Sequence, residues 1–351
     1  MGIIKANVMS SLGWAIVSTG RHSDQKMAPA INKSQCNHIS AVVSRDLNRA
    51  KAFAYEHNVS AAYDDFEKML QDKNVDAVYL ASPNHLHADQ TIKSAIAGKH
   101  VLCEKPMALS VRDGENMIEA CENSKVNLAI GFHLRAHPAH QYLRSLVSEG
   151  ILGTISLAQV SWVRGNRGQI VPPNRPDNQK WWEDPSMVGA GVTMATGVHC
   201  VDLLRYILDD EICEISSMFD SEKASLEHIA TMLIRFNKGT IASIITSRRN
   251  PDWPSQDVSI YGSLGSGISL DSVDTTLKGK LEVQSESVNK NMDFGSNDSI
   301  SLYVDQIEAF SKSIQGEGLP LATGQDGLQL IKVVNAMIES QRSGSKVFLD
   351  K

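Results

Sequence analysis

The sequence has few cysteines, and their spacing argues against a disulfide framework. The 351 residues include five cysteines, an odd number with no C-x-x-C pair: Cys36, Cys103, Cys121, Cys200 and Cys213. This pattern is typical of reduced thiols, so we expect a cytoplasmic protein. Cys103 lies beside a Glu-Lys pair, but small buried strand cysteines are common, and we interpret it as a packing residue.

Long apolar runs, basic runs and a signal-like start are missing as well. No apolar stretch approaches the roughly 18 residues that a membrane span needs, and residues 1–12 contain no h-region or cleavage site. The net charge of −6, without a basic cluster, argues against a nucleic-acid backbone as the main partner. We therefore predict no membrane and no nucleic-acid partner. The length allows two domains.

The first half of the chain alternates short apolar runs with helical patterns. The runs cover residues 14–17, 39–43, 75–80, 101–104 and 127–131, and an amphipathic or capped segment follows each of the first four. Strict alternation predicts an α/β domain with a doubly wound parallel sheet and crossover helices. We place this domain in residues 1–131.

After residue 131 the pattern becomes mainly strand-like. The predicted strands are residues 155–163, 212–219, 229–236, 240–247, 258–261 and 281–284, and Asn237-Lys238-Gly239 is a hairpin signal. Sequential strands with tight turns predict an α+β domain over residues 132–351, built on an antiparallel sheet. The polar stretch 285–299 is expected to be a loop. Two amphipathic helices close the chain, around 303–314 and 328–338, and they are free to pack back on the first domain.

The first predicted strand ends in a turn that matches the dinucleotide fingerprint G-x-G-x-x-G only in part. The turn is Ser18-Thr19-Gly20-Arg21-His22-Ser23, in which only the central glycine is kept. A glycine there lets the backbone approach a pyrophosphate, and the N-terminus of the next helix supplies amide donors. One glycine of three is equally compatible with a plain turn. The residues at the end of the second strand are therefore needed to distinguish a cofactor-binding turn from a plain one.

The end of the second strand carries cations where an NAD-binding protein usually has an acid. Ser44 and Arg45 are followed one helical turn later by Arg49. A hydroxyl and two guanidiniums suit a phosphate dianion, which favours NADP, with NAD as the other possibility. Asp46 is interpreted as a helix N-cap. A solvated basic helix start is the alternative.

A charged pair ends the fourth strand, where Glu104 and Lys105 stand before Pro106. Ligands of open α/β sheets bind outside the carboxyl ends of the strands, so this pair is placed to act on whatever the first turn holds. A surface ion pair is the alternative interpretation of an isolated Glu-Lys.

Taken together, these motifs resemble the Gfo/Idh/MocA family of NAD(P)-dependent sugar and polyol oxidoreductases. The resemblance extends from Trp14 to Val347, and the turn together with Ser44-Arg45 is most similar to the branch of 1,5-anhydro-D-fructose reductases and dihydrodiol dehydrogenases. The motifs that carry it are Ser18 to Arg21, Ser82-Pro83-Asn84-His85-Leu86-His87, Gly98 to Pro106, Arg135 to Pro138, Gly189 to Asp202, Ile260 to Gly265 and Gly324 to Gly327.

The resemblance implies a Rossmann domain followed by a domain with a large open antiparallel sheet. The open face implies a homodimer or homotetramer. By position, Lys105 contacts the substrate oxygen and the nicotinamide ribose, and His199 is the acid/base. An ammonium and an imidazolium would stabilise charge on a substrate oxygen and deliver a proton. The cofactor residues implied are Ser18, Thr19, Gly20, Arg21, His22, Ser44, Arg45, Arg49, Ser82, Pro83, Asn84, His87, Glu104 and Lys105.

The chain departs from the family pattern at Ala195, where an acidic residue usually stands four positions before the histidine. A missing carboxylate leaves His199 less basic, or indicates a substrate without the hydroxyl that this acid reads. The expectation most weakened is activity on a typical polyol.

Other conspicuous side chains have less defined roles. Substrate contacts are predicted for a small set in the second domain and its entrance: His133, Arg135, Trp181, Trp182 and Tyr303. The tryptophans could equally be core aromatics. The histidines 133, 137 and 140, and 85 and 87, could suggest a metal site, but Pro138 interrupts the first group and no suitable acid or cysteine accompanies either. We predict no metal, and expect His137 and His140 on a helix surface.

The sequence thus predicts an NADP-dependent oxidoreductase that transfers hydride between nicotinamide and a carbonyl or hydroxyl of a sugar-like or polyol substrate. Two alternatives stay open. One is a cofactor-binding sensor without turnover, which the alanine at position 195 favours. The other is a redox-neutral glycosidase that recycles a tightly held NAD.

Overall fold

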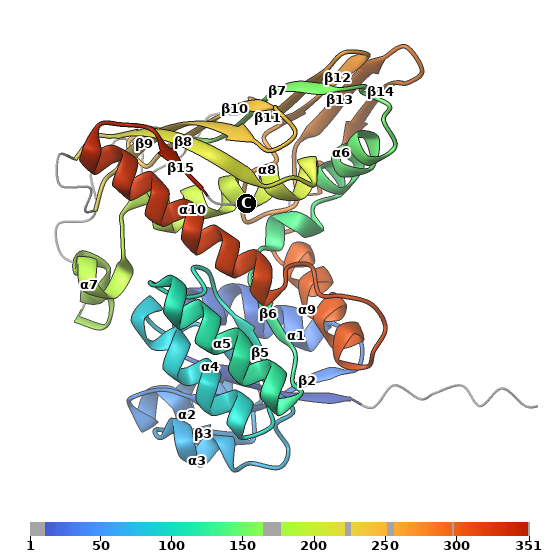
Figure 1. Cartoon of the computed structure of the whole chain (residues 1–351). Helices are drawn as coiled ribbons and strands as arrows, with labels where there is room; N and C mark the ends of the chain where they lie inside the picture. The colour runs from blue at the N-terminus through green and yellow to red at the C-terminus, as the bar shows by residue number, and fades with distance from the viewer. Residues whose placement is uncertain (1–10, 164–176, 222–225, 251–255, 297, 350–351) are drawn as a thin grey trace, which may run out of the picture.

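The computed structural model describes residues 11–163, 177–221, 226–250, 256–296 and 298–349, and the structural statements below refer to these residues. They form two sheets, a six-stranded one and a nine-stranded one. In Figure 1 the smaller sheet and its helices, coloured blue to teal, form the lower part of the molecule. The larger sheet forms a separate layer at the top.

The six-stranded sheet is entirely parallel, as the alternating pattern predicts. Its strand order is β3-β2-β1-β4-β5-β6, the doubly wound order of dinucleotide-binding domains. The central strands are buried on both faces, which explains their continuous apolar runs. The strands are β1 Leu12–Val17, β2 Asn37–Val43, β3 Ala61–Tyr63, β4 Ala77–Leu80, β5 His100–Cys103 and β6 Leu128–Ile130.

Helices cover this sheet and begin where the sequence places caps. The side chain of Asp46 accepts hydrogen bonds from the backbone N–H groups of Asn48 and Arg49, so its predicted N-cap role is confirmed. Ser110 caps α5 in the same way. The helices are η1 Ser23–Met27, α1 Ala28–Lys33, α2 Leu47–Glu56, α3 Phe66–Leu70, η2 Asn84–Leu86, α4 His87–Ile96 and α5 Val111–Ser124.

The nine-stranded sheet has the order β14-β13-β12-β11-β7-β10-β9-β8-β15. Its neighbours are antiparallel except for β7 and β10, which run parallel side by side. The large antiparallel sheet expected from sequence is present, and it is mixed at this one strand pair. The strands are β7 Ile155–Val163, β8 Ile212–Phe219, β9 Ile229–Phe236, β10 Ile241–Ser247, β11 Gln256–Gly262, β12 Gly265–Leu270, β13 Lys280–Ser285, β14 Asn289–Asp293 and β15 Val347–Phe348.

One sequence expectation about this sheet is wrong. The polar stretch 285–299 contains β14, which pairs antiparallel with β13. Every residue of β14 except Met292 is exposed, so an edge strand with few buried side chains has no apolar pattern to reveal it.

Helices line the inner side of the large sheet, and α8 is the most deeply buried of them. The helical stretch from Pro185 to Leu208 is long and apolar enough to cross a membrane by length and composition, but 78% of its apolar window is buried inside the protein. Burial against β7 and α6 accounts for its apolar character. The helical segments here are η3 His133–Ala136, α6 Pro138–Ser148, η4 Asp177–Glu183, α7 Pro185–Val188, η5 Thr193–Gly197 and α8 Val198–Leu208.

The two closing helices join the sheets. Helix α9 (Ser301–Ile314) packs on α1 and η3, and α10 (Gly324–Ser343) packs on α5 and on β8. In Figure 1 α10 runs from the first domain to the large sheet. Both closing helices therefore contact elements within residues 1–131, α9 through α1 and α10 through α5.

Candidate active site

A cavity of about 630 Å³ opens at the carboxyl ends of β1, β2 and β4, and we call it the cofactor groove. This is the edge at which doubly wound sheets bind ligands. Residues from the first turn, the end of β2, the loop after β4 and the η4 segment line it: Val17, Ser18, Thr19, Gly20, Arg21, His22, Gln25, Lys26, Val43, Ser44, Arg45, Arg49, Asp64, Phe66, Ala81, Ser82, Pro83, Leu86, Gln90, Gln179, Trp181, Trp182 and Thr275.

The first turn has the backbone of a phosphate-binding turn despite its two serines. Ser18 has a φ of 88°, a region that glycine normally occupies. A Cβ added to Gly20 would meet only the Ser18 hydroxyl, at 3.8 Å. Packing within the protein therefore does not require a glycine at this position. The space left by its missing side chain opens into the groove. The helix that follows offers N–H groups without acceptors in its own first turn, so the turn fits the pyrophosphate of a dinucleotide.

The far end of the groove holds the predicted phosphate ligands. Ser44 is buried, and its hydroxyl accepts a hydrogen bond from the Thr19 hydroxyl at 3.5 Å. Arg45 and Arg49 line the groove and are exposed to solvent. Sequence reasoning missed Asp64, an exposed acid on the same wall. Two guanidiniums and one carboxylate leave this end cationic.

Lys105 lies beyond the groove lining and is half-buried between the two domains. Its Nζ donates a hydrogen bond to the backbone oxygen of Ala195, 3.1 Å away. Burial lowers the pKa of Lys105, the Glu104 carboxylate opposes that shift, and the Arg248 guanidinium adds to it. A lysine so placed is a better proton donor than a solvated one.

Glu104 is the centre of a half-buried polar cluster. Its Oε1 accepts a hydrogen bond from the Tyr79 hydroxyl at 2.9 Å and lies 3.3 Å from the His22 Nε2. Burial alone would raise the pKa of Glu104, but His22, Lys105 and Tyr79 lower it to about 2. The ionised carboxylate therefore connects the cofactor turn to the catalytic motif. Sequence reasoning placed His22 and Glu104 in the site but not in contact.

His199 is enclosed by rings and has no anionic partner among the described residues. The rings of Phe132, His133 and Trp162 lie 5.8, 5.0 and 5.4 Å from its own. Its Nδ1 is buried without a hydrogen-bond partner. Burial holds the pKa of His199 well below its usual value, and the Lys105 ammonium and the neighbouring rings of His133 and His22 lower it further. The imidazole is therefore neutral at neutral pH, in contrast to the imidazolium that the sequence suggested.

His87 supports the site from behind instead of facing the groove. Its ring nitrogens lie 2.8 Å and 2.9 Å from the backbone oxygens of Pro106 and Ser82, and the residue is buried. The expected direct contact with the cofactor turn is not what the structure shows. His87 instead ties the loop after β4 to the motif of Lys105. Asn84 is also buried and donates to the Val188 oxygen.

Arg135 is used differently from the prediction. Its guanidinium donates to both carboxylate oxygens of Asp202, at 2.9 and 2.6 Å, and to Asp326 at 2.9 Å. It lines a second cavity, of about 600 Å³, beside Arg205 and Tyr206. Through these two carboxylates Arg135 links η3 to α8 and α10. Because its guanidinium is already occupied by them, we no longer count Arg135 among the substrate residues.

The other predicted substrate residues lie at the groove or beside His199. Trp181 and Trp182 are half-buried, stack on each other with ring centroids 4.4 Å apart, and line the groove. Tyr303 is buried, and its ring stacks on His133 at 4.8 Å. Lys26, which the sequence did not single out, lines the groove with Nζ 6.0 Å from the Tyr303 ring.

His137 and His140 are core residues, and the expectation of a helix surface is wrong. Both are fully buried. The Nε2 of His137 lies 2.9 Å from the Lys278 oxygen, and His140 lies between the Leu134 oxygen and the Ser272 hydroxyl. Burial holds the pKa of His137 at about 4. Pro138 starts α6, and the turn it imposes brings both rings inward.

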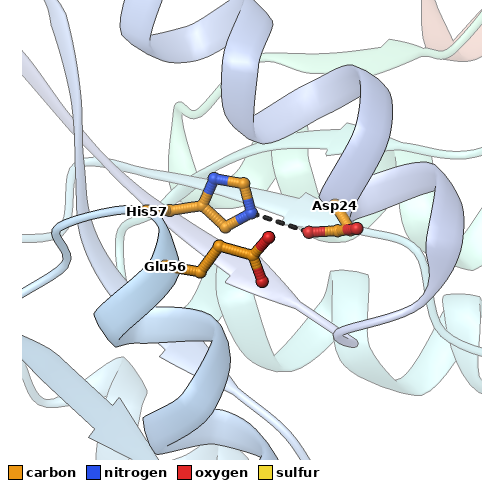
Figure 2. A group of neighbouring side chains, drawn as sticks. All are labelled: Asp24, Glu56 and His57. Atoms are coloured by element: carbon orange, nitrogen blue, oxygen red, sulfur yellow. Dashed lines mark hydrogen bonds and ion pairs between the residues drawn. The ribbon is translucent and has the colours of Figure 1, made fainter.

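One group in the described ranges has the side chains of a metal site, and it contains none of the histidines singled out from sequence. The ligand atoms of Asp24, Glu56 and His57 lie within 4.8 Å of one another. Figure 2 shows His57 directed at Asp24, with Glu56 beside them. The His57 Nε2 to Asp24 Oδ1 distance of 2.8 Å is a direct ion pair joining η1 to the end of α2, which accounts for the group without an ion.

Comparisons with known proteins agree with this architecture. Residues 12–132 match the Gfo/Idh/MocA oxidoreductase family with its NAD-binding Rossmann fold, and residues 140–267 match the C-terminal domain of the same family. The chain is 28% identical to 1,5-anhydro-D-fructose reductase of Ensifer adhaerens, over 94% of this chain and 96% of that protein. It is also 28% identical to myo-inositol 2-dehydrogenase of Thermotoga maritima, over 84% and 87% of the two chains.

Solved structures show the same fold. The aldose-aldose oxidoreductase of Caulobacter crescentus in complex with glycerol superposes with a TM-score of 0.85 at 23% identity, covering 97% of this chain and 100% of that one. Levoglucosan dehydrogenase in complex with NADH and levoglucosan gives a TM-score of 0.84 at 20% identity, covering 97% and 100%. With both domains matched in order and a nicotinamide groove at the expected edge, the chain belongs to the Gfo/Idh/MocA family of oxidoreductases.

Proposed function

We propose that the protein is an NADP-dependent oxidoreductase that transfers hydride between nicotinamide and a carbonyl or hydroxyl group of a sugar-like substrate. The observation that carries the proposal is the groove that runs from Arg45 and Arg49, past the Gly20 turn, to His22. The His22 Nε2 lies 3.3 Å from the carboxylate of Glu104, the residue next to Lys105. Lys105 in turn donates to the Ala195 oxygen on the second domain, one helical turn before His199. The named relatives act on sugars and polyols.

Two ends of the groove would hold two ends of the cofactor. The Gly20 turn fits the pyrophosphate, and Ser44, Arg45 and Arg49 fit the 2′-phosphate of NADP. Two relatives, both D-xylose 1-dehydrogenases, are named for NADP, with 26% and 24% identity. The bound nicotinamide would supply or accept the hydride.

The chain's own residues would handle the proton and the charge. In the reduction direction the Lys105 ammonium stabilises the negative charge that develops on the substrate oxygen. Its lowered pKa makes it the better proton donor of the pair, because His199 is held neutral. In the oxidation direction the hydroxyl proton moves to neutral Lys105 or to His199. Proton transfer, assigned to His199 from the sequence, is therefore shared with Lys105.

The outer face of the nine-stranded sheet supports a homo-oligomer, in line with the family. Leu157, Met218 and Leu233 on this face are 47%, 73% and 61% exposed, and Ile241 pairs with Leu157 across neighbouring strands. Among the residues that the structure describes, Figure 1 shows no helix over this side of the sheet. We infer a homodimer or homotetramer through the face. All five cysteines are free, which supports a cytoplasmic location.

The test is a panel of sugars, polyols and dicarbonyls followed at the nicotinamide absorbance, with NADPH and NADH in parallel. We expect turnover of at least one compound, faster with the NADP pair. Cofactor binding in a fluorescence titration without turnover of any compound would indicate the sensor instead. Glycoside cleavage with no net absorbance change would indicate the redox-neutral glycosidase.

A further inference from the structure

Glu104 and Lys105 are neighbours in the chain, but their side chains contact different groups. The Lys105 Nζ donates a hydrogen bond to the backbone oxygen of Ala195 on the second domain, 3.1 Å away. The Glu104 carboxylate accepts from the Tyr79 hydroxyl at 2.9 Å and forms its ion pair with the His22 Nε2 at 3.3 Å. In the part of the chain that the structure describes, no ion pair joins the carboxylate to the Lys105 ammonium.

Packing at the edge of the parallel sheet fits the Glu104 carboxylate in this position. A Cβ added to Gly131, which follows β6, would lie only 2.8 Å from the Glu104 Oε1, so the glycine leaves room for that oxygen. Tyr79 on β4 is fully buried, and its hydroxyl cannot turn to water. The other carboxylate oxygen, Oε2, lies 3.3 Å from the backbone N of Lys105. Two side chains, Tyr79 and His22, therefore hold Oε1.

His22 is the half of this hold that faces the cofactor groove. Its side chain is 38% exposed, it lines the groove, and its ring packs edge-on against Tyr303 with centroids 5.2 Å apart. Its Nε2 is buried and is not aligned for a full hydrogen bond to Glu104. Bonds of this kind are often loose in an unliganded site and tighten when ligands bind. His22 thus connects the groove surface to the carboxylate beside Lys105.

We propose that His22 is a positioning residue for hydride transfer, which keeps the Glu104 carboxylate on the side of the cofactor turn and away from the Lys105 ammonium. This inference rests on the proposed function and deepens it. A carboxylate released from His22 can approach the ammonium, and an opposite charge at closer range favours the protonated lysine. Lys105 would then hold its proton more tightly, which slows proton donation in reduction and the formation of neutral lysine for oxidation.

The other charged and titratable groups around His22, Glu104 and Lys105 come from several elements. They are Arg21 before η1, Lys26 on η1, His133 on η3, His199 on α8, Arg248 after β10, Asp274 after β12 and Tyr303 on α9. Asp274 pairs with Lys278 at 2.7 Å. Burial lowers the pKa of Lys105, Glu104 raises it and Arg248 lowers it. A change in the position of Glu104 is therefore the route by which His22 acts on the lysine.

Two substitutions of His22 test the hydrogen bond, with His38→Gln on the exposed start of β2 as control. His22→Leu removes the donor, whereas His22→Gln keeps an N–H at similar reach. The pH at which kcat/KM for oxidation is half-maximal should rise by about half a pH unit or more in His22→Leu. His22→Gln should restore most of that shift, and the control should show none. An unchanged or lower midpoint in His22→Leu, or a shift that the glutamine does not reduce, would overturn the inference.

The double variant His22→Leu with Glu104→Gln shows whether His22 acts through the carboxylate. Glu104→Gln alone should move the midpoint in the opposite direction, to lower pH, because it removes the charge that favours protonated Lys105. The double variant should match Glu104→Gln, since His22 then has no carboxylate to hold. An upward shift from His22→Leu that is equally large in both backgrounds would mean that His22 acts directly or only supports the fold, and the inference would fail.

A second readout needs no turnover and separates this inference from the proposed function. Competitive labelling with acetic anhydride over a series of pH values, read by peptide mass spectrometry, gives the midpoint at which Lys105 becomes reactive in the unliganded protein. If no compound is turned over, the proposed function fails first, and this midpoint then decides the inference. A higher midpoint in His22→Leu than in the wild type supports it, and an equal or lower one overturns it.

Discussion

The two ends of the cofactor groove use charge in opposite ways. At one end Arg45, just before helix α2, and Arg49, in its first turn, are exposed, so water and salt screen them. Beyond the other end Lys105 and Glu104 are half-buried and His199 is buried, and the pKa of each is shifted by burial and by a neighbouring charge. Exposed charges can select a cofactor but contribute modestly, whereas buried charges set protonation states and therefore chemistry.

The largest effect is expected at the buried end. Lys105→Met should lower kcat by about a hundredfold to a thousandfold, the range for loss of one preorganised donor to a developing oxyanion. The Kd for NADPH should stay within a few-fold, because the groove residues that hold the phosphates are untouched. Steady-state kinetics and fluorescence titration measure the two quantities.

Lys93→Met is the matched control for that variant, since Lys93 pairs with Glu67 and Asp89 on the surface of α4. It should keep the wild-type rate. A Lys105→Met enzyme with near-wild-type turnover on a confirmed substrate would remove Lys105 from the chemistry.

The second prediction concerns the exposed end. Arg45→Ala combined with Arg49→Ala should raise the Kd for NADPH on the order of tenfold or more, and barely change that for NADH. Charge-assisted hydrogen bonds are worth roughly 1.5–3 kcal/mol when well formed, but solvent and the neighbouring Asp64 reduce the value here.

Lys51→Ala is the matched control, on the same helix but outside the groove lining. The NADPH preference of the wild type should also weaken as salt rises. Equal affinity of the wild type for NADH and NADPH would show that Ser44, Arg45 and Arg49 do not hold a phosphate.

The third prediction uses the coupling between Glu104 and Lys105. The rate of oxidation should rise with pH as Lys105 loses its proton, with an apparent pKa below the 10.5 of a free lysine. Glu104→Gln removes the carboxylate that raises the pKa of Lys105, so this rise should move to lower pH. A kcat/KM profile measures it, with Glu115→Gln on the exposed face of α5 as control. If the pH dependence of kcat/KM is the same in Glu104→Gln as in the wild type, Glu104 does not set the pKa of Lys105.

The same variant has a signature in acid stability. The pKa of Glu104 lies at about 2 in the fold, against 4.5 for a free glutamate. Its stabilisation is therefore complete above pH 4.5 and is lost as pH falls towards 2. Denaturant unfolding of Glu104→Gln should show less loss of stability across that range than the wild type. Parallel loss in both proteins would contradict an ionised, buried Glu104.

The smallest effect is expected in the turn itself. Ser18→Gly should stabilise the protein by about 1 kcal/mol, because a non-glycine residue at a φ of 88° is strained. Ser124→Gly, at the end of helix α5, should destabilise by a similar or smaller amount. Thermal unfolding of both variants gives the comparison, and destabilisation by Ser18→Gly would mean that its hydroxyl matters more than its backbone.

Much of the fold and part of the site were readable from the sequence, because local patterns determine them. Continuous apolar runs gave the buried strands of the parallel sheet, and Asp46 and Ser110 marked helix starts by hydrogen bonds to their own neighbours. Gly20 and Lys105 each follow the carboxyl end of a predicted parallel strand, so the sequence placed both at the same edge of the sheet. These inferences need only periodicity and short-range chemistry.

Other features depend on contacts between distant segments. Nothing in the sequence joins His22 to Glu104, or Arg135 to both Asp202 and Asp326. Because such long-range contacts cannot be read from the sequence, His137 was predicted to be exposed and β14 was predicted to be a loop. A histidine or arginine has the same sequence signal in a core as on a surface, and only its tertiary partners decide which it becomes. Burial and neighbouring charge, which set the protonation of Lys105 and His199, are therefore properties of the folded cleft.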